Sequence, residues 1–279
     1  MPHASPEPAR LNERQAKILR IVTRQGYATI DALAGRFDTS HQTIRRDIIL
    51  MDRAGLLKRF HGGAGIVDGR ERPHYDDKRH LAIEAKRAIA AEAARRIGDR
   101  MTVFIDVGTT AEALAQCLLP LRVQCRVVTP NLNVGLALAG HPTIETVVVG
   151  GTARTRDGAL VGPLAIALIE QFSFDYAFIG FSGFDADGAP MDFDLDKVLV
   201  KRAAMARAAT TVGIVDASKY RRQASIRLAE AGDLEQLLSD LRPPAALARV
   251  LGDAGVEIVL ARETRPAALS PPPPATLGG

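Results

Sequence analysis

Residues 40–64 read SHQTIRRDIILMDRAGLLKRFHGGA, and this stretch combines a capped amphipathic helix with a short basic hairpin. Ser40 is a favourable helix N-cap, and the apolar residues Ile44, Ile48 and Met51 fall on one stripe of the helix that follows. The opposite face of that helix carries polar and basic side chains, namely His41, Gln42, Arg45 and Arg46. The pattern predicts an exposed, positively charged helix face above an apolar core.

The end of this helix is also marked in the sequence. Gly55 is a typical stop signal, and residues 56–65 (LLKRFHGGAG) predict a short strand and a glycine turn. This hairpin carries Lys58, Arg59 and His61. A basic hairpin directly after an amphipathic helix is typical of a wing.

Two further helices are expected upstream. Asn12 followed by Gln15 matches a capping box, and residues 29–37 (TIDALAGRF) form a second, shorter helical segment that Thr29 can cap. The first helix has one apolar face, formed by Ile18, Leu19 and Val22. Three helices and a wing predict a winged helix-turn-helix domain over residues 1–65.

The net charge of the chain is concentrated in the same region. Residues 1–70 hold 12 Lys/Arg against 7 Asp/Glu, whereas the remaining 209 residues hold 24 against 25. A small basic module on a nearly neutral body is the arrangement expected of a nucleic-acid binder. The alternative is a three-helix bundle whose basic face is merely solvated.

The predicted partner is double-stranded operator DNA, because an α-helix fits the major groove and its first turns reach base edges. Base reading is assigned to His41, Gln42 and Arg45. Phosphate contacts are assigned to Arg46, Lys58 and Arg59. The predicted DNA surface also includes Ser40, Thr43 and His61. Such heads read paired half-sites, so a homodimer or homotetramer is expected.

Residues 40–64 resemble part of a known protein family. The TIRRD of the third helix and the HGGA of the wing are similar to the N-terminal signature of the DeoR family of bacterial transcriptional regulators. The resemblance continues to about residue 262. It implies a C-terminal domain that senses sugar phosphates and is related to ribose-phosphate isomerases.

The rest of the chain alternates between apolar runs and helical segments. Residues 66–79 read as a polar linker, residues 80–261 as the sensor domain and residues 262–279 as a disordered Pro-rich tail. Strands are expected at 103–105, 123–128, 144–149, 176–181, 211–215 and 256–260. Helices are expected at 81–97, 110–119, 131–140, 162–170, 196–209 and 243–254. This alternation predicts an α/β fold with a Rossmann-like, largely parallel sheet.

Small and polar residues follow five of the expected strands. The loops are 106–110, 129–131, 150–154, 180–183 and 216–219. The carboxyl ends of parallel strands share one edge, so these loops should converge on a ligand. Glycine allows close approach, hydroxyl and N–H groups bind phosphate oxygens, and Lys or Arg supplies countercharge. Any one loop could instead be a plain turn or helix cap. Residues predicted here to bind an effector are Asn131, Gly151, Arg154, Ser182 and Gly183.

The family resemblance adds further candidates. It implies that Lys201, within VKRA, matches a lysine of the isomerase-like fold, and that Asp216 and Lys219 match its last loop. From the sequence alone, Asp216 could equally be a helix cap and Lys219 a solvated charge. The phosphate-cradling loop implied by the resemblance comprises Asp106, Gly108, Thr109 and Thr110.

The stretch 191–205 (MDFDLDKVLVKRAAM) is similar to family members that respond to glycerol 3-phosphate. This similarity makes a phosphorylated sugar or polyol the expected effector, with glycerol 3-phosphate the leading candidate, and it adds Asp192 and Asp194 to the site. The two aspartates could equally be capping charges ahead of a helix. At residues 195–197 the chain reads Leu-Asp-Lys, where those members are expected to carry an aromatic residue, a histidine and an acid.

Several other functions are disfavoured. The chain has neither a GxxxxGK[ST] loop nor a strand followed by GxGxxG, which argues against nucleotide hydrolysis and dinucleotide binding. Cys117 and Cys125 are expected to be core thiols, and no metal or cofactor is expected. The absence of a long apolar stretch and of a signal peptide predicts a cytoplasmic protein with no membrane partner.

The remaining alternative is an enzyme. A sugar-phosphate isomerase or deaminase with an appended helical domain would need an acid/base pair, for which Asp185 and Lys201 are the candidates. Such an enzyme has no evident use for a DNA-reading head. The sequence therefore favours sensing without turnover.

Overall fold

The computed structural model describes residues 11–25, 27–54, 56–60, 63–65, 82–153, 157–222 and 224–261. The predicted linker, the predicted tail, His61 and Arg154 lie outside the described residues. Among the helices within these ranges, none has the length and apolar character needed to cross a membrane.

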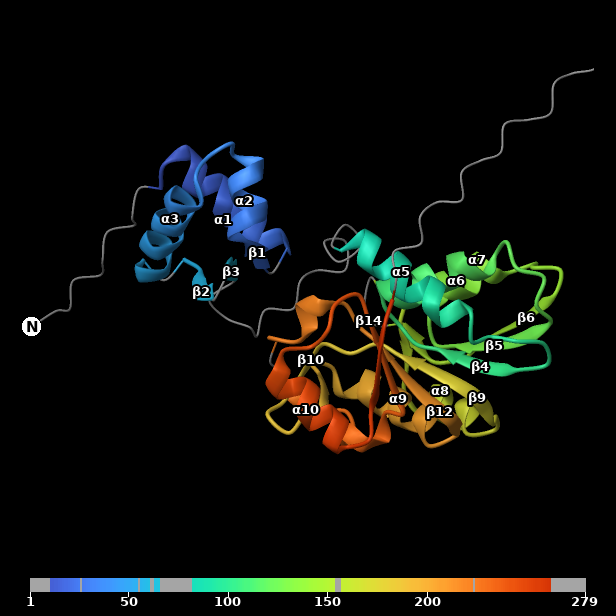
Figure 1. Cartoon of the computed structure of the whole chain (residues 1–279). Coiled ribbons are helices and arrows are strands. Elements are labelled where there is room, and N and C mark those ends of the chain that lie inside the picture. The colour runs from blue at the N-terminus through green and yellow to red at the C-terminus, as the bar shows by residue number, and fades with distance from the viewer. Residues whose placement is uncertain are drawn as a thin grey trace, which may run out of the picture.

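The N-terminal domain contains the three expected helices (Figure 1). They are α1 (Glu13–Gln25), α2 (Ile30–Arg36) and α3 (His41–Arg53). The capping box forms at the start of α1, because Asn12 N donates to Gln15 Oε1 at 3.1 Å and Gln15 N donates to Asn12 Oδ1 at 2.8 Å. Ser40 caps α3 through a bond from Thr43 N to its Oγ at 3.2 Å. The core is apolar, with Ile18, Val22, Leu33, Ile44, Ile48 and Met51 at its centre.

The wing has one more strand than expected. β2 (Lys58–Phe60) and β3 (Gly63–Gly65) pair in antiparallel fashion, and β1 (Tyr27–Thr29), between α1 and α2, adds to β3. The sheet order is β1-β3-β2. A strand of three residues is too short to show a period-two pattern, so only its pairing with distant residues reveals it.

Asp47 ties the third helix to the first. Its side chain is buried between α1 and α3 and accepts from Arg14 Nε at 2.6 Å and from Gln15 Nε2 at 3.0 Å. A buried carboxylate needs such partners to offset its desolvation. The aspartate of TIRRD therefore fixes the orientation of α3.

The C-terminal domain is built on a seven-stranded sheet in which every pairing is parallel. The strand order is β15-β14-β12-β9-β4-β5-β6. The strands are β4 (Thr102–Ile105), β5 (Cys125–Thr129), β6 (Ile144–Val148), β9 (Phe174–Ile179), β12 (Ala208–Ile214), β14 (Gln236–Ser239) and β15 (Glu257–Leu260). The chain builds outward from β4 first through β5 and β6, then from β9 on the other side. The strand order therefore reverses between β4 and β9, where doubly wound sheets bind ligands.

Helices cover both faces of this sheet (Figure 1). One core contains buried residues of α5 (Ile83–Ala94), α6 (Thr109–Leu118) and α7 (Leu132–Leu138). The other contains residues of α8 (Pro163–Ile169), α9 (Leu195–Met205) and α10 (Ala245–Asp253). The α/β fold and its parallel sheet are thus confirmed.

Several short strands were not predicted. β14 is missing from the expected set, as are β7 (Thr152–Ala153) with β8 (Leu160–Val161) and the small sheet of β10 (Gly183–Phe184), β11 (Pro190–Asp192) and β13 (Ile226–Arg227). Most of these have two or three residues, so their positions depend on tertiary pairing rather than on periodicity. The small sheet matters for function because β11 carries Asp192.

Candidate functional site

The DNA-reading side chains predicted on α3 lie on its exposed face. His41, Gln42, Arg45 and Arg46 are all exposed, and Arg59 on β2 is exposed as well. Ser40 and Thr43 are occupied at the helix start, where their hydroxyls lie 2.9 Å apart. Lys58 is described by its backbone alone. The α3 face therefore presents a continuous polar and basic surface.

The five polar loops follow β4, β5, β6, β9 and β12, all at the carboxyl edge of the sheet. Three of them are joined by direct hydrogen bonds. Thr129 Oγ1 donates to Ile105 O at 2.6 Å, and Gly180 N donates to Asp106 Oδ2 at 3.0 Å. The loop after β4 is thus fixed to the loops after β5 and β9, at the switch point of the sheet.

Lys201 lies at the centre of this network, on the buried face of α9. Its Nζ donates to Asp192 Oδ2 at 2.5 Å and to Gly180 O at 2.6 Å, and lies 3.4 Å from Asp106 Oδ2. Ser182 Oγ donates to the other oxygen of Asp192 at 2.8 Å. The structure thus brings together four residues that the sequence predicts to bind an effector, namely Asp106, Ser182, Asp192 and Lys201, and their contact with an effector stays a prediction. Three acceptors surround Lys201, so its ammonium is held by the protein itself.

Electrostatics in this buried group reflect competition between desolvation and ion pairing. Burial lowers the pKa of Lys201, but Asp106 and Asp192 together outweigh burial and raise it. Burial likewise opposes ionisation of Asp192, but Lys201 and two further hydrogen bonds lower its pKa. For Asp106, burial prevails over the Lys201 cation and raises its pKa.

Two polar atoms at the switch point lack a hydrogen-bond partner among the described residues. They are Asp106 Oδ1 and Asn131 Nδ2, and both residues are fully buried. Asn131 Oδ1 is already used, since it accepts from Asn133 N at 2.9 Å at the start of α7. A buried polar atom without a partner costs free energy, so a group that bonds these two atoms would stabilise the site.

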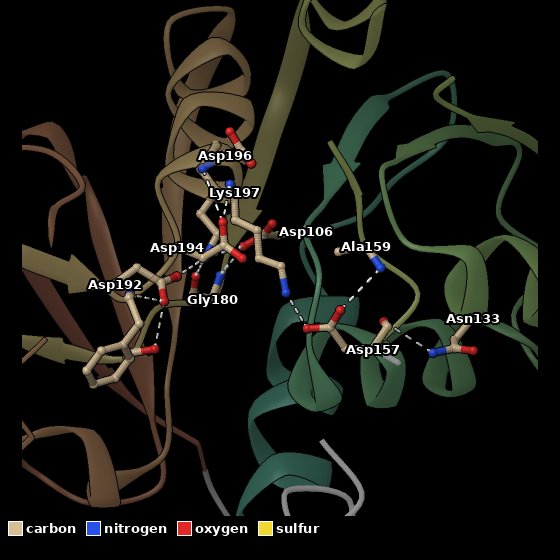
Figure 2. A network of polar contacts seen from close by, with 12 residues as sticks. Asp106, Asn133, Asp157, Ala159, Gly180, Asp192, Asp194, Asp196 and Lys197 are labelled. Atoms are coloured by element: carbon tan, nitrogen blue, oxygen red, sulfur yellow. Dashed lines mark hydrogen bonds and ion pairs between the residues drawn. The ribbon is translucent and has the colours of Figure 1, made fainter. Parts of the chain in front are cut away.

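A second buried lysine lies one turn earlier on α9. Lys197 forms an ion pair with Asp157, and both side chains are buried (Figure 2). The amide of Asn133 on α7 donates to Glu112 Oε1 at 3.1 Å and to Asp157 O at 3.5 Å. The sequence does not predict this ion pair between Lys197 and Asp157. Nothing local signals a pair of residues that are 40 positions apart.

A basic cluster lies beside the β12 end of the site. Lys219 Nζ is 3.7 Å from Asp216 Oδ2, and Asp216 is almost fully buried. Burial raises the pKa of Asp216, but Lys219 and other partners outweigh it and lower the pKa to about 2. Burial lowers the pKa of Lys219 and of Arg222, while the charge of Asp216 opposes both shifts.

Lys86 on α5 belongs to the same cluster and was also missed. It is buried, burial lowers its pKa to about 8, and the charge of Asp216 only partly opposes that shift. The charges of Lys219 and Glu112 also act on it. An available signal was its place three residues before the buried Ile89, since a lysine near an apolar stripe is unusual.

The start of α6 is linked to this cluster through Glu112, an acid in its first turn whose charge acts on Lys86. Gly108 is the N-cap of α6 with φ +121°, a conformation that L side chains rarely adopt, and it makes no side-chain cap bond. A Cβ added there would meet no atom within 4 Å. Thr109 and Thr110 form the first turn and are half-buried. Their backbone N–H groups and hydroxyls, at the positive end of the helix, are suited to an anion.

Other predicted site residues have structural roles. Asp194 caps α9, accepting from Asp196 N at 3.1 Å and Lys197 N at 3.4 Å. Gly151 has φ +143°, and a Cβ there would lie 2.7 Å from Val161 O. A Cβ on Gly183 would overlap the carbonyl oxygen of Arg222. These three positions are explained by local geometry, and their contact with an effector stays a prediction.

Two family models and one solved structure are similar to parts of this chain. The family model for the DeoR-like helix-turn-helix domain matches residues 14–70, and that for the DeoR C-terminal sensor domain matches residues 81–241. The solved structure of ribose 5-phosphate isomerase A from Neisseria gonorrhoeae is similar over 50% of this chain and 53% of that chain, with 16% identity and a TM-score of 0.37.

Two curated relatives align along nearly their whole length. The HTH-type transcriptional repressor CsqR of Escherichia coli is 35% identical over 252 residues, which cover 90% of this chain and 96% of that protein. The glycerol-3-phosphate regulon repressor of Haemophilus influenzae is 36% identical over 247 residues, covering 88% and 96%. Two domain matches in tandem and these relatives show that the chain belongs to the DeoR family of transcriptional regulators.

Proposed function

We propose that this protein is a DNA-binding transcriptional repressor whose operator binding is relieved by a phosphorylated sugar or polyol. Glycerol 3-phosphate is the leading candidate, because it appears in the name of the relative that is 36% identical. The observation that carries the proposal is the meeting of an open helix start, a basic cluster and a buried carboxylate network at one edge of the sheet.

The phosphate of the effector would lie at the start of α6. The N–H groups after Gly108 and the hydroxyls of Thr109 and Thr110 would donate to its oxygens. Lys219 and Lys86 would supply countercharge, since binding an anion relieves the cost of burying these two lysines near Asp216.

The hydroxyl groups of the effector would lie toward Asp106 and Asn131. A hydroxyl both donates and accepts, so it can serve Asp106 Oδ1 as a donor and Asn131 Nδ2 as an acceptor. Lys201 holds Asp106 and Asp192 in place for this contact. A direct bond from Lys201 to the phosphate, as the sequence predicts, would require it to exchange one of its three present acceptors.

Coupling to DNA would pass through α5. This helix is the first described element after the predicted linker, and its first turns carry Lys86. An effector that contacts Lys86 therefore acts on the segment that continues into the DNA-binding domain. It relieves repression only if it binds more tightly to the arrangement that cannot bind DNA. The head would read paired half-sites as part of a homodimer or homotetramer.

The alternative of an isomerase or deaminase relied on Asp185 and Lys201 as an acid/base pair. Asp185 instead accepts from Arg227 at 2.7 Å, while Lys201 bonds Asp192. Each candidate is thus engaged in its own ion pair, and the relatives CsqR and the glycerol-3-phosphate regulon repressor carry the names of repressors. A regulator without turnover fits these observations better than an enzyme.

The test begins with operator sequences selected by the purified protein from a random duplex pool. Fluorescence anisotropy of the labelled operator should show tight binding, and glycerol 3-phosphate or another phosphorylated polyol should release it. The same samples are assayed for conversion of the sugar phosphate. Sustained turnover, or failure to select any DNA, would contradict the proposal.

A further inference from the structure

The two ends of the effector site differ in charge. At the β12 end, Lys219 lies 3.7 Å from Asp216, whose charge also acts on Lys86 and Arg222, and Glu112 in the first turn of α6 is a second acid acting on Lys86. At the switch point, Asp106 and Asp192 share the single cation Lys201. The second pair on α9, Lys197 with Asp157, balances itself. Among the described residues, one end therefore has excess positive charge and the other has excess negative charge.

The two ends belong to one site. The charge of Asp192 acts on Lys219, so the carboxylate network and the basic cluster lie within electrostatic range of each other. Asp106 is the last residue of the network before Gly108 and the start of α6. A small phosphate ester anchored at the start of α6 would extend its other end toward Asp106.

The acidic end is built to receive a hydrogen-bond donor. Asp106 Oδ2 already accepts from Gly180 N, and Asp192 accepts from Ser182, Phe193 N and Lys201. The remaining atom, Asp106 Oδ1, is fully buried without a partner, and Asn131 Nδ2 is a second such atom at the neighbouring strand end. An alcohol can satisfy both, whereas a second anion would lie near the carboxylate of Asp192, whose charged form Lys201 stabilises, while Lys201 itself is already held by three protein oxygens.

We infer that the site selects a phosphate monoester whose other end is neutral and hydroxylated, and that Asp106 and Asp192 reject esters carrying a second anionic group. This inference rests on the proposed function, because it specifies the class of the effector. Bisphosphates and phosphorylated sugar acids are then excluded by charge. Among phosphate monoesters whose other end is neutral, size and shape determine which one binds.

The test compares matched pairs of ligands that differ by one carboxylate. Glycerol 3-phosphate is paired with glycerate 3-phosphate, and glucitol 6-phosphate with 6-phosphogluconate, each pair differing by a CH2OH group in place of the carboxylate. Dissociation constants are measured on the full chain by calorimetry, with inorganic phosphate as the common reference. In any pair that binds, the ligand without the carboxylate should bind at least about tenfold more tightly. Like charges about 4 Å apart repel strongly at a partly buried site.

Variants assign the selection to the carboxylates. Asp106→Asn should reduce the ratio of the two dissociation constants to about threefold or less, because it keeps the shape and removes the charge. Asp192→Asn, a second variant, keeps the test decisive if Asp106→Asn fails to fold. The matched control is Glu170→Gln, which removes an exposed acid at the C-cap of α8 and should leave the ratio unchanged.

The outcomes distinguish a failure of the charge selection from a failure of the proposed effector class. A glycerate 3-phosphate affinity equal to or above that of glycerol 3-phosphate would overturn the charge selection and leave a phosphate-sensing repressor in place. An unchanged ratio in both aspartate variants would also overturn it. If no phosphate ester of either kind binds, the proposed effector class fails, and the selection fails with it.

Discussion

Lys201 Nζ lies 2.5 Å from Asp192 Oδ2, and both side chains are buried where the strand order of the sheet reverses. This pair joins α9 to β11 and places a second carboxylate, Asp106, against the same ammonium. The cation therefore holds together the two carboxylates toward which the effector hydroxyls are proposed to lie. Its loss would leave two carboxylates buried beside each other.

Replacing Lys201 with methionine should lower the free energy of unfolding of the sensor domain by about 3–5 kcal/mol, because removal of one partner leaves buried charge uncompensated. Urea denaturation followed by circular dichroism measures the change. Lys17→Met is the control, since Lys17 pairs with Glu13 on the exposed surface of α1 and should cost about 0.5 kcal/mol or less. Equal losses in the two variants would show that the Lys201 pair is not structural.

Lys86 should make the stability of the ligand-free protein depend on pH. Burial lowers its pKa from 10.5 to about 8, so the unfolded chain binds more protons than the folded chain between these values. The contribution of Lys86 to the free energy of unfolding should therefore increase as the pH rises from about 8 toward 10.5. Lys86→Met should flatten this rise, and profiles that remain parallel to the parent's would contradict the assignment.

Effector affinity should show the opposite dependence. A phosphate beside Lys86 raises its pKa, so binding takes up a proton once the pH exceeds about 8, and affinity should fall above that pH. Calorimetry in buffers of different ionisation enthalpy counts the protons taken up. Lys86→Met should bind effector more weakly at neutral pH and take up fewer protons at high pH.

The contact of Asp47 with α1 predicts a loss of stability in the DNA-binding domain. Asp47→Ala would remove the acceptor of both Arg14 and Gln15, and should lower the free energy of unfolding by about 1–3 kcal/mol. Asp31→Ala removes an exposed acid on α2 and should change it by about 0.5 kcal/mol or less. Thermal denaturation of both variants decides between a structural role for Asp47 and none.

Arg45 and Arg46 are both exposed on α3, and they should differ in how they bind DNA. Arg45→Ala should lose about 1–3 kcal/mol at a single base position, whereas Arg46→Ala should weaken binding to all sequences and reduce the salt slope by about one unit. Competition assays with single-base operator variants at several salt concentrations measure both effects. Unchanged binding in both variants would remove α3 from the DNA interface.

The sequence predicts the helices and the site edge because their signals are local. Ser40 and the stripe through Ile44, Ile48 and Met51 define α3 within a dozen residues. The loops that end β4, β9 and β12 were likewise recognisable from apolar runs that stop at small or polar residues. A parallel sheet then brings these loops to one edge by topology alone.

What could not be predicted depends on contacts between distant residues. Lys86 looks like a helix surface lysine until the fold buries it near Asp216, which lies 130 positions later. The Lys197 pair with Asp157 likewise forms only when α9 packs near the end of β8. The sequence predicts that Lys201 contacts a ligand, whereas its protein partners, Gly180 O, Asp192 and Asp106, are shown only by the fold. Ion-pair partners of this kind are set by tertiary packing.

The most direct test of effector-controlled repression is one linkage measurement. Glycerol 3-phosphate is titrated by calorimetry into the free protein and into the protein saturated with its selected operator. If the effector releases DNA, its dissociation constant must rise on the operator complex by the same factor by which it weakens operator binding, about 5- to 150-fold. Equal effector affinity for the free protein and the operator complex would contradict the account, because a ligand that does not distinguish the two states cannot relieve repression.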